Sequence, residues 1–189
     1  MLFILEKEFL KPDKKDINLI ISKADLNGFQ YGHYLYGGLK KYFEENERKN
    51  IEKMILIKYK EENIESFEKK CQIGENDSYI CSLIRQDSID EFISYVNQTN
   101  YSLTNCIKPS IFETNTFLMR KEISLIEYAS FFSSIQVIQY LKNNQIEFTN
   151  SIFLYSIHSN NAELIEMLLE NEKVTNTILD DKNKIQNVF

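Results

Sequence analysis

The sequence is poor in the residues on which disulfide-rich and metal-binding proteins depend. Its 189 residues include three cysteines and two histidines. Cys71, Cys81 and Cys106 form no Cys-x-x-Cys pair and are odd in number, which indicates reduced thiols rather than a disulfide framework or a zinc site. His33 and His158 leave very few ways to build a histidine-based metal site or a catalytic triad. We therefore expect neither a metal nor a cofactor.

Motifs of several enzyme classes are also missing. The chain has no His-Glu-x-x-His, Gly-x-Ser-x-Gly or P-loop spacing. Four of the five glycines lie between residues 27 and 38, where they do not match Gly-x-Gly-x-x-Gly and follow no predicted strand. The sequence thus gives no support to an enzymatic function.

Long apolar runs are absent as well. No stretch approaches the roughly 18 apolar residues of a membrane-spanning helix. Residues 1–5 are apolar, but charged residues 6–8 end that run far short of a signal-peptide core. We expect a soluble, cytoplasmic protein without a membrane partner.

Positive charge is too sparse and too scattered for a nucleic-acid partner. The net charge is −6, and lysine and arginine alternate with glutamate between residues 40 and 70. Mixed charges of this kind are typical of solvated helix faces. With 43% hydrophobic and 26% charged residues, the composition is that of an ordinary globular protein.

The most informative feature present is an internal repeat. Residues 124–141 align with residues 151–168 at a spacing of 27 residues. In each copy a short helix is predicted to end at a polar turn, Ser133-Ser134 or Asn160-Asn161, before a second helix begins. A fixed period of roughly 20–50 residues is typical of stacked repeat architectures.

The second helix of each copy carries a broad apolar stripe. Its apolar residues recur at i, i+1, i+3 and i+4, which predicts a helix that packs on neighbours at both sides. They are Val137, Ile138, Tyr140 and Leu141 in one copy, and Leu164, Ile165, Met167, Leu168 and Leu169 in the other.

A more divergent copy lies upstream, at residues 80–96. Its turn precedes Ser133 by 46 residues, whereas its apolar run aligns best at a spacing of 45. The extra length falls in residues 97–117, which are rich in Asn, Thr and Ser and contain Pro109. We interpret this segment as an inserted surface loop, either functional or a bland insertion.

Residues 1–76 predict a helical extension or cap of the stack. A short helix is expected at residues 16–24, a Gly/Tyr-rich loop at 27–38, and two helices between 39 and 71. The stripe expected to be buried in the last two is Leu39, Tyr42, Phe43, Ile51, Met54, Ile55 and Tyr59.

The turn and second helix of each copy resemble the ankyrin consensus T-P-L-H-x-A-A-x-x-G-H-x-E-x-V-x-x-L-L. Neither copy keeps the T-P-L-H box, Ser133 or Asn160 replaces the turn glycine, and the period is 27 instead of about 33. The matching residues are Ser124, Ile126, Ala129, Gln136, Ile138 and Leu141, then Ser151, Phe153, Ser156, Glu163, Ile165, Leu168 and Leu169.

The nearest likeness is to a divergent, short-repeat ankyrin-like family of unknown function, found in parasitic protists such as trichomonads. Residues 124–129 and 163–165 carry this resemblance. It covers residues 77–174 and implies an all-α solenoid of stacked helix pairs, with units 78–96, 118–144 and 145–171 and a lost or reduced β-hairpin finger. It implies a protein-binding module and nothing about catalysis.

In ankyrin-like proteins the contact-making positions follow the paired small residues of the first helix. The resemblance therefore marks Arg85 and Gln86, Phe131 and Phe132, and His158 and Ser159 as partner-binding residues. One of the two phenylalanines is either an exposed apolar anchor or fills the space of the missing finger. In the Gly/Tyr-rich loop, Tyr34 and Tyr36 are further candidate anchors.

Our leading hypothesis is a non-enzymatic, cytosolic protein-protein interaction module. The alternatives are a small helical enzyme or regulatory subunit that uses residues 27–38 and His33, and a fragment of a longer repeat scaffold. The partner expected under the leading hypothesis is another protein of unknown identity.

The C-terminal end predicts an incomplete unit. A further first helix would begin near Ile178, but the sequence ends at Phe189 before a second helix is complete. Residues 175–189 then fold back as a partial repeat or cap, or this end associates with another copy, because an uncovered apolar stripe favours association.

If residues 175–189 form a cap, deleting them lowers the melting temperature and promotes aggregation, because the last helix pair loses its cover. Thermal melts and size-exclusion chromatography measure both effects. A truncated protein that remains monomeric and equally stable would contradict the cap.

Overall fold

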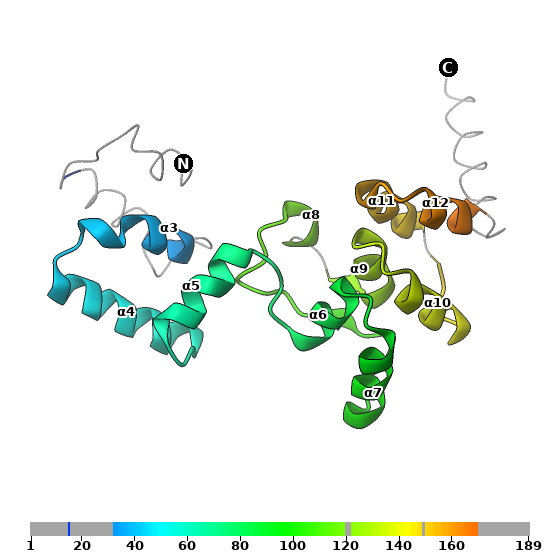
Figure 1. Cartoon of the computed structure of the whole chain (residues 1–189), viewed down its shortest axis with the longest axis horizontal. Helices are drawn as coiled ribbons and strands as arrows, with labels where there is room; N and C mark the ends of the chain where they lie inside the picture. The colour runs from blue at the N-terminus through cyan, green and yellow to red at the C-terminus, as the bar shows by residue number, and fades with distance from the viewer. Residues whose placement is uncertain (1–14, 16–31, 120–121, 149, 170–189) are drawn as a thin grey trace, which may run out of the picture. The chain divides into compact units, whose positions relative to one another are not determined.

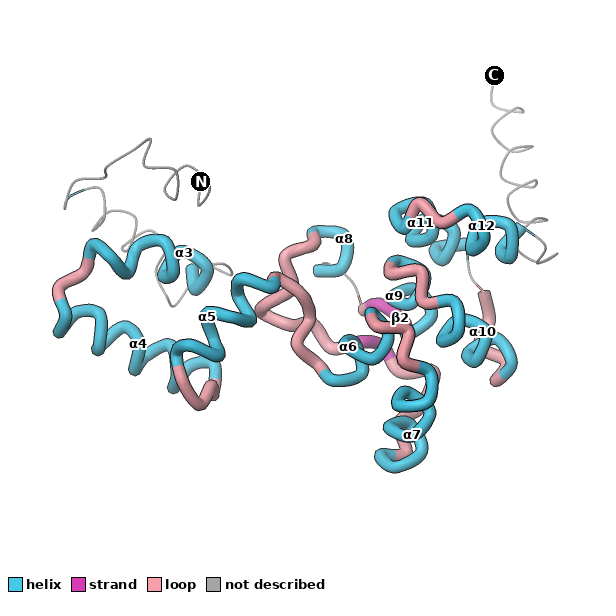
Figure 2. Tube along the Cα trace, in the orientation of Figure 1, coloured by secondary structure: helices cyan, strands magenta, loops and turns pink. Residues whose placement is uncertain are grey.

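The computed structural model describes residue 15 and residues 32–119, 122–148 and 150–169, without the side chains of residues 32–35 and 150. The chain divides into two compact units, residues 1–75 and 76–189. Helices make up most of the described chain, and its strands are two residues long (Figures 1 and 2). The predicted all-α class is confirmed at this level. Within these ranges, no helix has the length and apolarity needed to cross a bilayer.

The first unit contains three α-helices and a short 3-10 helix among its described residues. Asn63 caps one helix by accepting the Ser66 N–H at 2.8 Å, and this helix ends at Gly74 with φ 70°. Two helices are present between residues 39 and 73, as expected, but the first begins at Glu45 and not at Leu39. The elements are α3 (Gly32–Leu39), η1 (Lys40–Tyr42), α4 (Glu45–Tyr59) and α5 (Ile64–Ile73).

The predicted loop at residues 27–38 is wrong from Gly32 onward, where the chain forms α3. Glycine lowers helix stability, but tertiary packing offsets this cost here. Tyr36 and Leu39 are buried, and the Tyr36 hydroxyl donates a hydrogen bond to Glu52 on α4. The glycine count alone therefore gave the wrong local structure.

The described residues of the first unit bury a small set of apolar side chains. The most deeply buried of them include Ile55 on α4 and Phe67 on α5, and the Phe67 ring stacks on Tyr59 at 5.5 Å between centroids. Met54 was expected in the buried stripe, but it is 52% exposed. Among the described elements, α4 packs against α5. The helix expected at residues 16–24 lies outside the described residues.

The second unit contains three consecutive helix pairs, each joined by a short turn. A non-glycine residue takes the left-handed conformation at the same place in each turn: Asp87, Ser133 and Asn160, with φ 49°, 57° and 51°. The predicted turns and their spacings are confirmed. The pairs are α6 (Tyr79–Arg85) with α7 (Ile89–Thr99), α9 (Leu125–Phe131) with α10 (Ile135–Asn143), and α11 (Asn150–Ser159) with α12 (Ala162–Leu169).

The helix pairs lie side by side in the order of the sequence. Helix α9 packs against α6 before it and α11 after it, and α10 packs against α7 (Figure 1). The second helices bury residues four positions apart, as the apolar stripe predicts. These are Phe92 and Val96, Val137 and Leu141, and Leu164 and Leu168.

The last helix pair exposes apolar side chains. Leu169 was expected in the apolar stripe of α12, but it is 48% exposed. Leu154 and Ile157 on α11 are about as exposed. The segment 175–189 lies outside the described residues, so its role as a cap and self-association through this end stay predictions.

Residues 97–117 are more ordered than the predicted surface loop. Strand β1 (Cys106–Ile107) lies within them and pairs antiparallel with β2 (Ile123–Ser124) in a very short ladder. Helix α8 (Thr116–Met119) follows. Phe112 and Glu113 are buried, which corrects the loop interpretation.

Polar contacts fasten this inserted segment to the start of the unit. The Glu113 carboxylate accepts the backbone N–H groups of Asn76 at 3.2 Å and Asn115 at 2.8 Å. The Asn76 side-chain amide donates to the Lys108 carbonyl at 2.9 Å. Asn76 is more than 30 residues from both Lys108 and Glu113, so the local sequence pattern does not predict these contacts.

The first two turns are joined by a set of contacts that we name the turn clamp, formed by Asp87, Ser134 and the backbone they bind. The Asp87 carboxylate accepts the N–H groups of Gln136 at 3.1 Å and Val137 at 3.0 Å. In return, the Ser134 hydroxyl donates to the Ile84 carbonyl. Asp87 thus caps a helix of the next pair, where free N–H groups need acceptors.

The junction between the second and third pairs is built differently. Ser133 stands at the position of Asp87, and its hydroxyl has no hydrogen-bond partner in the described chain. Helix α12 is capped locally, because Asn161 accepts the Leu164 N–H at 3.2 Å. The turn clamp is therefore specific to the first junction among the described turns.

Burial predicts that Leu141→Ala and Leu168→Ala each lower the free energy of unfolding by about 2–5 kcal/mol, as large-to-small core changes do. Chemical denaturation measures the change. Leu169→Ala is the matched control next to Leu168, and its effect should stay within about 0.5 kcal/mol because the side chain is half exposed. Equal effects at residues 168 and 169 would contradict the assigned register.

The turn clamp predicts that Asp87→Ala lowers the free energy of unfolding by about 1–2 kcal/mol, as loss of a helix cap does. Asp87→Asn keeps one of the two acceptor oxygens and tolerates the left-handed backbone, so it should lose less stability than Asp87→Ala. Urea denaturation of the parent chain and of both variants measures the free energies of unfolding. If both variants were equally destabilised, the capping contact would not be the cause.

Candidate binding surfaces

Arg85 was expected to contact a partner, but the fold uses it internally. Its guanidinium donates from Nη1 to the Asn76 carbonyl at 2.9 Å and to the Tyr128 hydroxyl at 2.7 Å. Burial raises the pKa of Tyr128 above its ordinary value, so the phenol stays neutral and accepts this bond. Arg85 is half-buried and supports the fold of the second unit through these bonds, and its contact with a partner stays a prediction. Gln86 beside it is exposed.

The Gly/Tyr-rich segment does not present Tyr36 as an anchor. This side chain is 4% exposed, which corrects the expectation that it contacts a partner. Burial is the main cause that raises the Tyr36 pKa, and the Glu52 carboxylate adds to it. Tyr34 and His33 belong to α3, and their side chains lie outside the described residues.

Three other predicted residues come together with Phe117 in what we name the aromatic cluster: Phe117, Phe131, Phe132 and His158. The His158 ring lies 4.1 Å from the Phe117 ring and 5.7 Å from the Phe131 ring, between centroids. Phe131 and Phe132 meet edge-on at 5.0 Å. Phe117 comes from α8, so the inserted segment completes this surface.

The aromatic cluster is an apolar surface with a single titratable group. His158 is exposed, whereas the three phenylalanines are half-buried and pack on the core. Phe131 and Phe132 are each half-buried, so the choice between an exposed anchor and a residue that fills the space of the missing finger stays a prediction. Ser159 is half-buried, and its hydroxyl donates to the Ser156 carbonyl at 2.6 Å.

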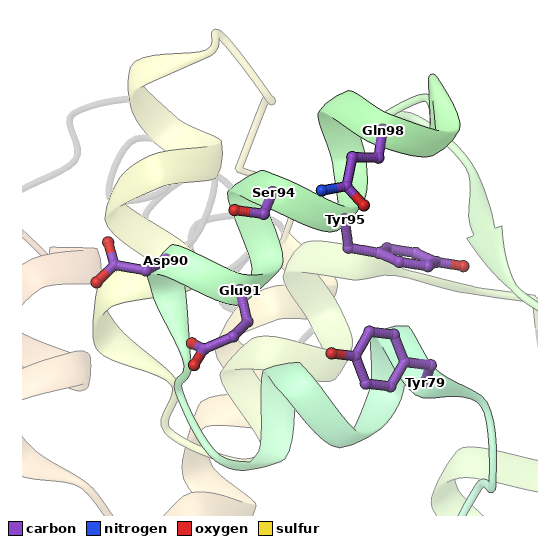
Figure 3. A pocket seen from close by; sticks show the side chains of 6 residues that line it. All are labelled: Tyr79, Asp90, Glu91, Ser94, Tyr95 and Gln98. Atoms are coloured by element: carbon purple, nitrogen blue, oxygen red, sulfur yellow. The ribbon is translucent and has the colours of Figure 1, made fainter.

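A second surface, which the sequence did not indicate, is the α6–α7 groove. Figure 3 shows the six side chains that line it. The groove has a volume of about 300 Å³. The Tyr79 and Tyr95 rings meet edge-on, with 5.3 Å between centroids. The lining residues are Tyr79, Asp90, Glu91, Ser94, Tyr95 and Gln98.

Part of the signal for this groove is visible in the sequence. Asp90, Ser94 and Gln98 recur every four residues, which places them on one face of α7. Such a polar face is usually solvated, so on its own it predicts no site. Tyr79 belongs to a different helix, and only the packing of α6 against α7 brings it beside this face.

The cysteines offer no metal site in the described chain, where no three His, Cys, Asp or Glu side chains are grouped as a metal would need. Burial raises the pKa of the Cys71 thiol to about 12, and the Glu68 and Glu61 carboxylates add to the effect. Burial likewise raises the Cys81 pKa. Cys106 is exposed.

Comparison of the chain with protein-family models, with curated proteins and with solved structures found no match. The ankyrin-like interpretation therefore depends on the residue pattern and on the helix pairs themselves.

The cysteine environments predict that Cys106 reacts first with a thiol reagent at pH 8. There the Cys71 thiolate is only about one part in ten thousand, because pH 8 is roughly four units below its pKa. Labelling with dithionitrobenzoate should show a single fast thiol, which Cys106→Ser removes. A fast phase that persists in this variant would contradict the assignment.

Proposed function

We propose that the protein is a non-enzymatic protein-protein interaction module built as an ankyrin-like solenoid. The observation that carries this proposal is the recurrence of one helix-turn-helix design in three consecutive pairs. Each pair has a left-handed residue at the same point of its turn, and the first helices α6, α9 and α11 pack in series. Repeated units of this kind expose equivalent positions along one extended surface.

The surface that fits this function is the helix-end strip, which we define as Gln86, Phe131, Phe132 and His158. These residues stand at the ends of three first helices that pack against each other. Contact between the rings of Phe131 and His158 supports continuity of the strip across the second and third pairs. Half-buried aromatic rings held by a core are well suited to a partner, because they lose little conformational freedom on binding.

The charge of the chain favours a protein partner over nucleic acid. A net charge of −6 repels phosphate, and the groove of the second unit carries two carboxylates. A cytoplasmic location agrees with the three free cysteines, since reducing compartments keep thiols unpaired.

The test is affinity capture from the source cells, with the full chain as bait. We expect a stoichiometric protein partner, and we expect Gln86→Ala combined with His158→Ala to weaken its binding by about fivefold or more, as loss of interface contacts does. Both side chains are exposed, so the fold should tolerate the change.

Gln139→Ala is the matched control, because this exposed residue lies on α10 outside the strip. Hydrogen exchange of the complex should protect the ends of α6, α9 and α11. Recovery of no stoichiometric partner, or a partner equally sensitive to Gln139→Ala, would contradict the proposed function.

A further inference from the structure

The α6–α7 groove has an aromatic wall that solvent can reach. Tyr79 is 55% exposed, and Tyr95 supports its ring edge-on. The face of a tyrosine ring is electron-rich and attracts a cation that lies within about 6 Å. Tyrosine is also enriched at the centres of protein interfaces. This wall is therefore suited to a cationic side chain.

Two carboxylates of α7 also line the groove. Asp90 and Glu91 are exposed, and no lysine or arginine lines the groove. The ion pairs found among the described residues involve neither carboxylate. In Figure 3 the Tyr79 hydroxyl points toward the side on which Glu91 lies, and Asp90 lies farther from the rings.

Helix stability explains the two acids only in part. Both stand in the first turn of α7, where the helix dipole favours carboxylates. The dipole does not explain why a half-exposed tyrosine from another helix lies beside them. The exposed Tyr79 ring of α6 and the carboxylates of α7 each favour a cation, and both line the same groove.

We propose that this groove binds an arginine side chain in a basic segment of the partner, an inference that rests on the proposed function and specifies its partner. A guanidinium is planar, stacks on aromatic faces and donates paired hydrogen bonds to a carboxylate. A volume of about 300 Å³ is at the small end for ligand sites and has room for a long side chain. The net charge of −6 attracts such a segment from a distance.

The test is an NMR titration of the full chain with a short peptide that has two arginines among glycines and serines. We expect shifts in the first turn of α6 and along α7, including the Gln98 side-chain amide. A citrulline peptide, which has the same shape without charge, should bind far more weakly, and a lysine peptide should fall between the two. Equal binding of the citrulline peptide would overturn the proposal.

Variants separate a specific groove from general attraction to an acidic protein. Glu91→Gln should lower the affinity for the arginine peptide by roughly threefold or more, as loss of an exposed charge contact does. Glu163→Gln is the matched control: it removes the same charge from the first turn of α12, and each glutamate directly precedes a buried residue, Phe92 or Leu164. Equal weakening by both variants would overturn the proposal.

The tyrosine has its own pair of variants. Tyr79→Ala should weaken binding, whereas Tyr79→Phe keeps the ring and should retain most of it. Each variant's thermal melt is compared with that of the parent chain to exclude unfolding. Failure of Tyr79→Ala to weaken binding would show that the aromatic wall is not used.

The groove and the interaction function fail in distinguishable ways. If a partner captured from cells binds Glu91→Gln and the parent chain equally, the groove proposal is wrong and the interaction function stands. If the arginine peptide binds the groove as expected but no partner is captured, the groove is supported and the wider function fails.

Discussion

The second unit depends on covering helix α9 from several sides at once. This helix has seven residues, five of them buried, and so short a helix is unstable alone in water. Helices α6, α10 and α11 and both short strands pack against it. These neighbours therefore all pack on the same buried side chains of α9. A helix this short is stable only when the adjacent helix pairs cover it.

Two polar contacts support that burial where apolar packing alone would leave unpaired groups. The turn clamp gives acceptors to the first N–H groups of α10 and a donor to the end of α6. Arg85 joins the Tyr128 hydroxyl to the Asn76 carbonyl, so a deeply buried tyrosine keeps a hydrogen bond. Both contacts link residues more than 40 positions apart, which ties the first helix pair to the second.

The inserted segment 97–117 adds contacts at the junction between the first and second helix pairs that the junction between the second and third pairs does not have among the described residues. Its buried Glu113 and Phe112, together with the short ladder of β1 and β2, add contacts near the start of the unit, while Phe117 of α8 reaches the aromatic cluster. The insertion thus takes part both in the core and in a candidate binding surface. The α6–α7 groove offers a different, acidic chemistry on the first helix pair.

Much of the helical organisation was predictable because it depends on local pattern. The period of 27 residues, the polar turns at Ser133 and Asn160, and the buried positions Val137, Leu141, Leu164 and Leu168 follow from helical periodicity and from residues that end helices. The misplacement of Met54 and Leu169 shows the limit of the same pattern, because periodicity gives the direction of a face but not how much of it a neighbour covers.

By itself the sequence determined a helical protein with repeated helix pairs, since 3.6-residue periodicity and turn residues act over short distances. Only the tertiary structure decided that residues 32–39 are helical, that Arg85 and Glu113 serve the core, that Tyr36 is buried, and that Tyr79 faces the carboxylates of α7. Each of these depends on a partner from another element. The residues next to a polar or aromatic side chain in the sequence do not show whether it is solvated or packed against a distant residue.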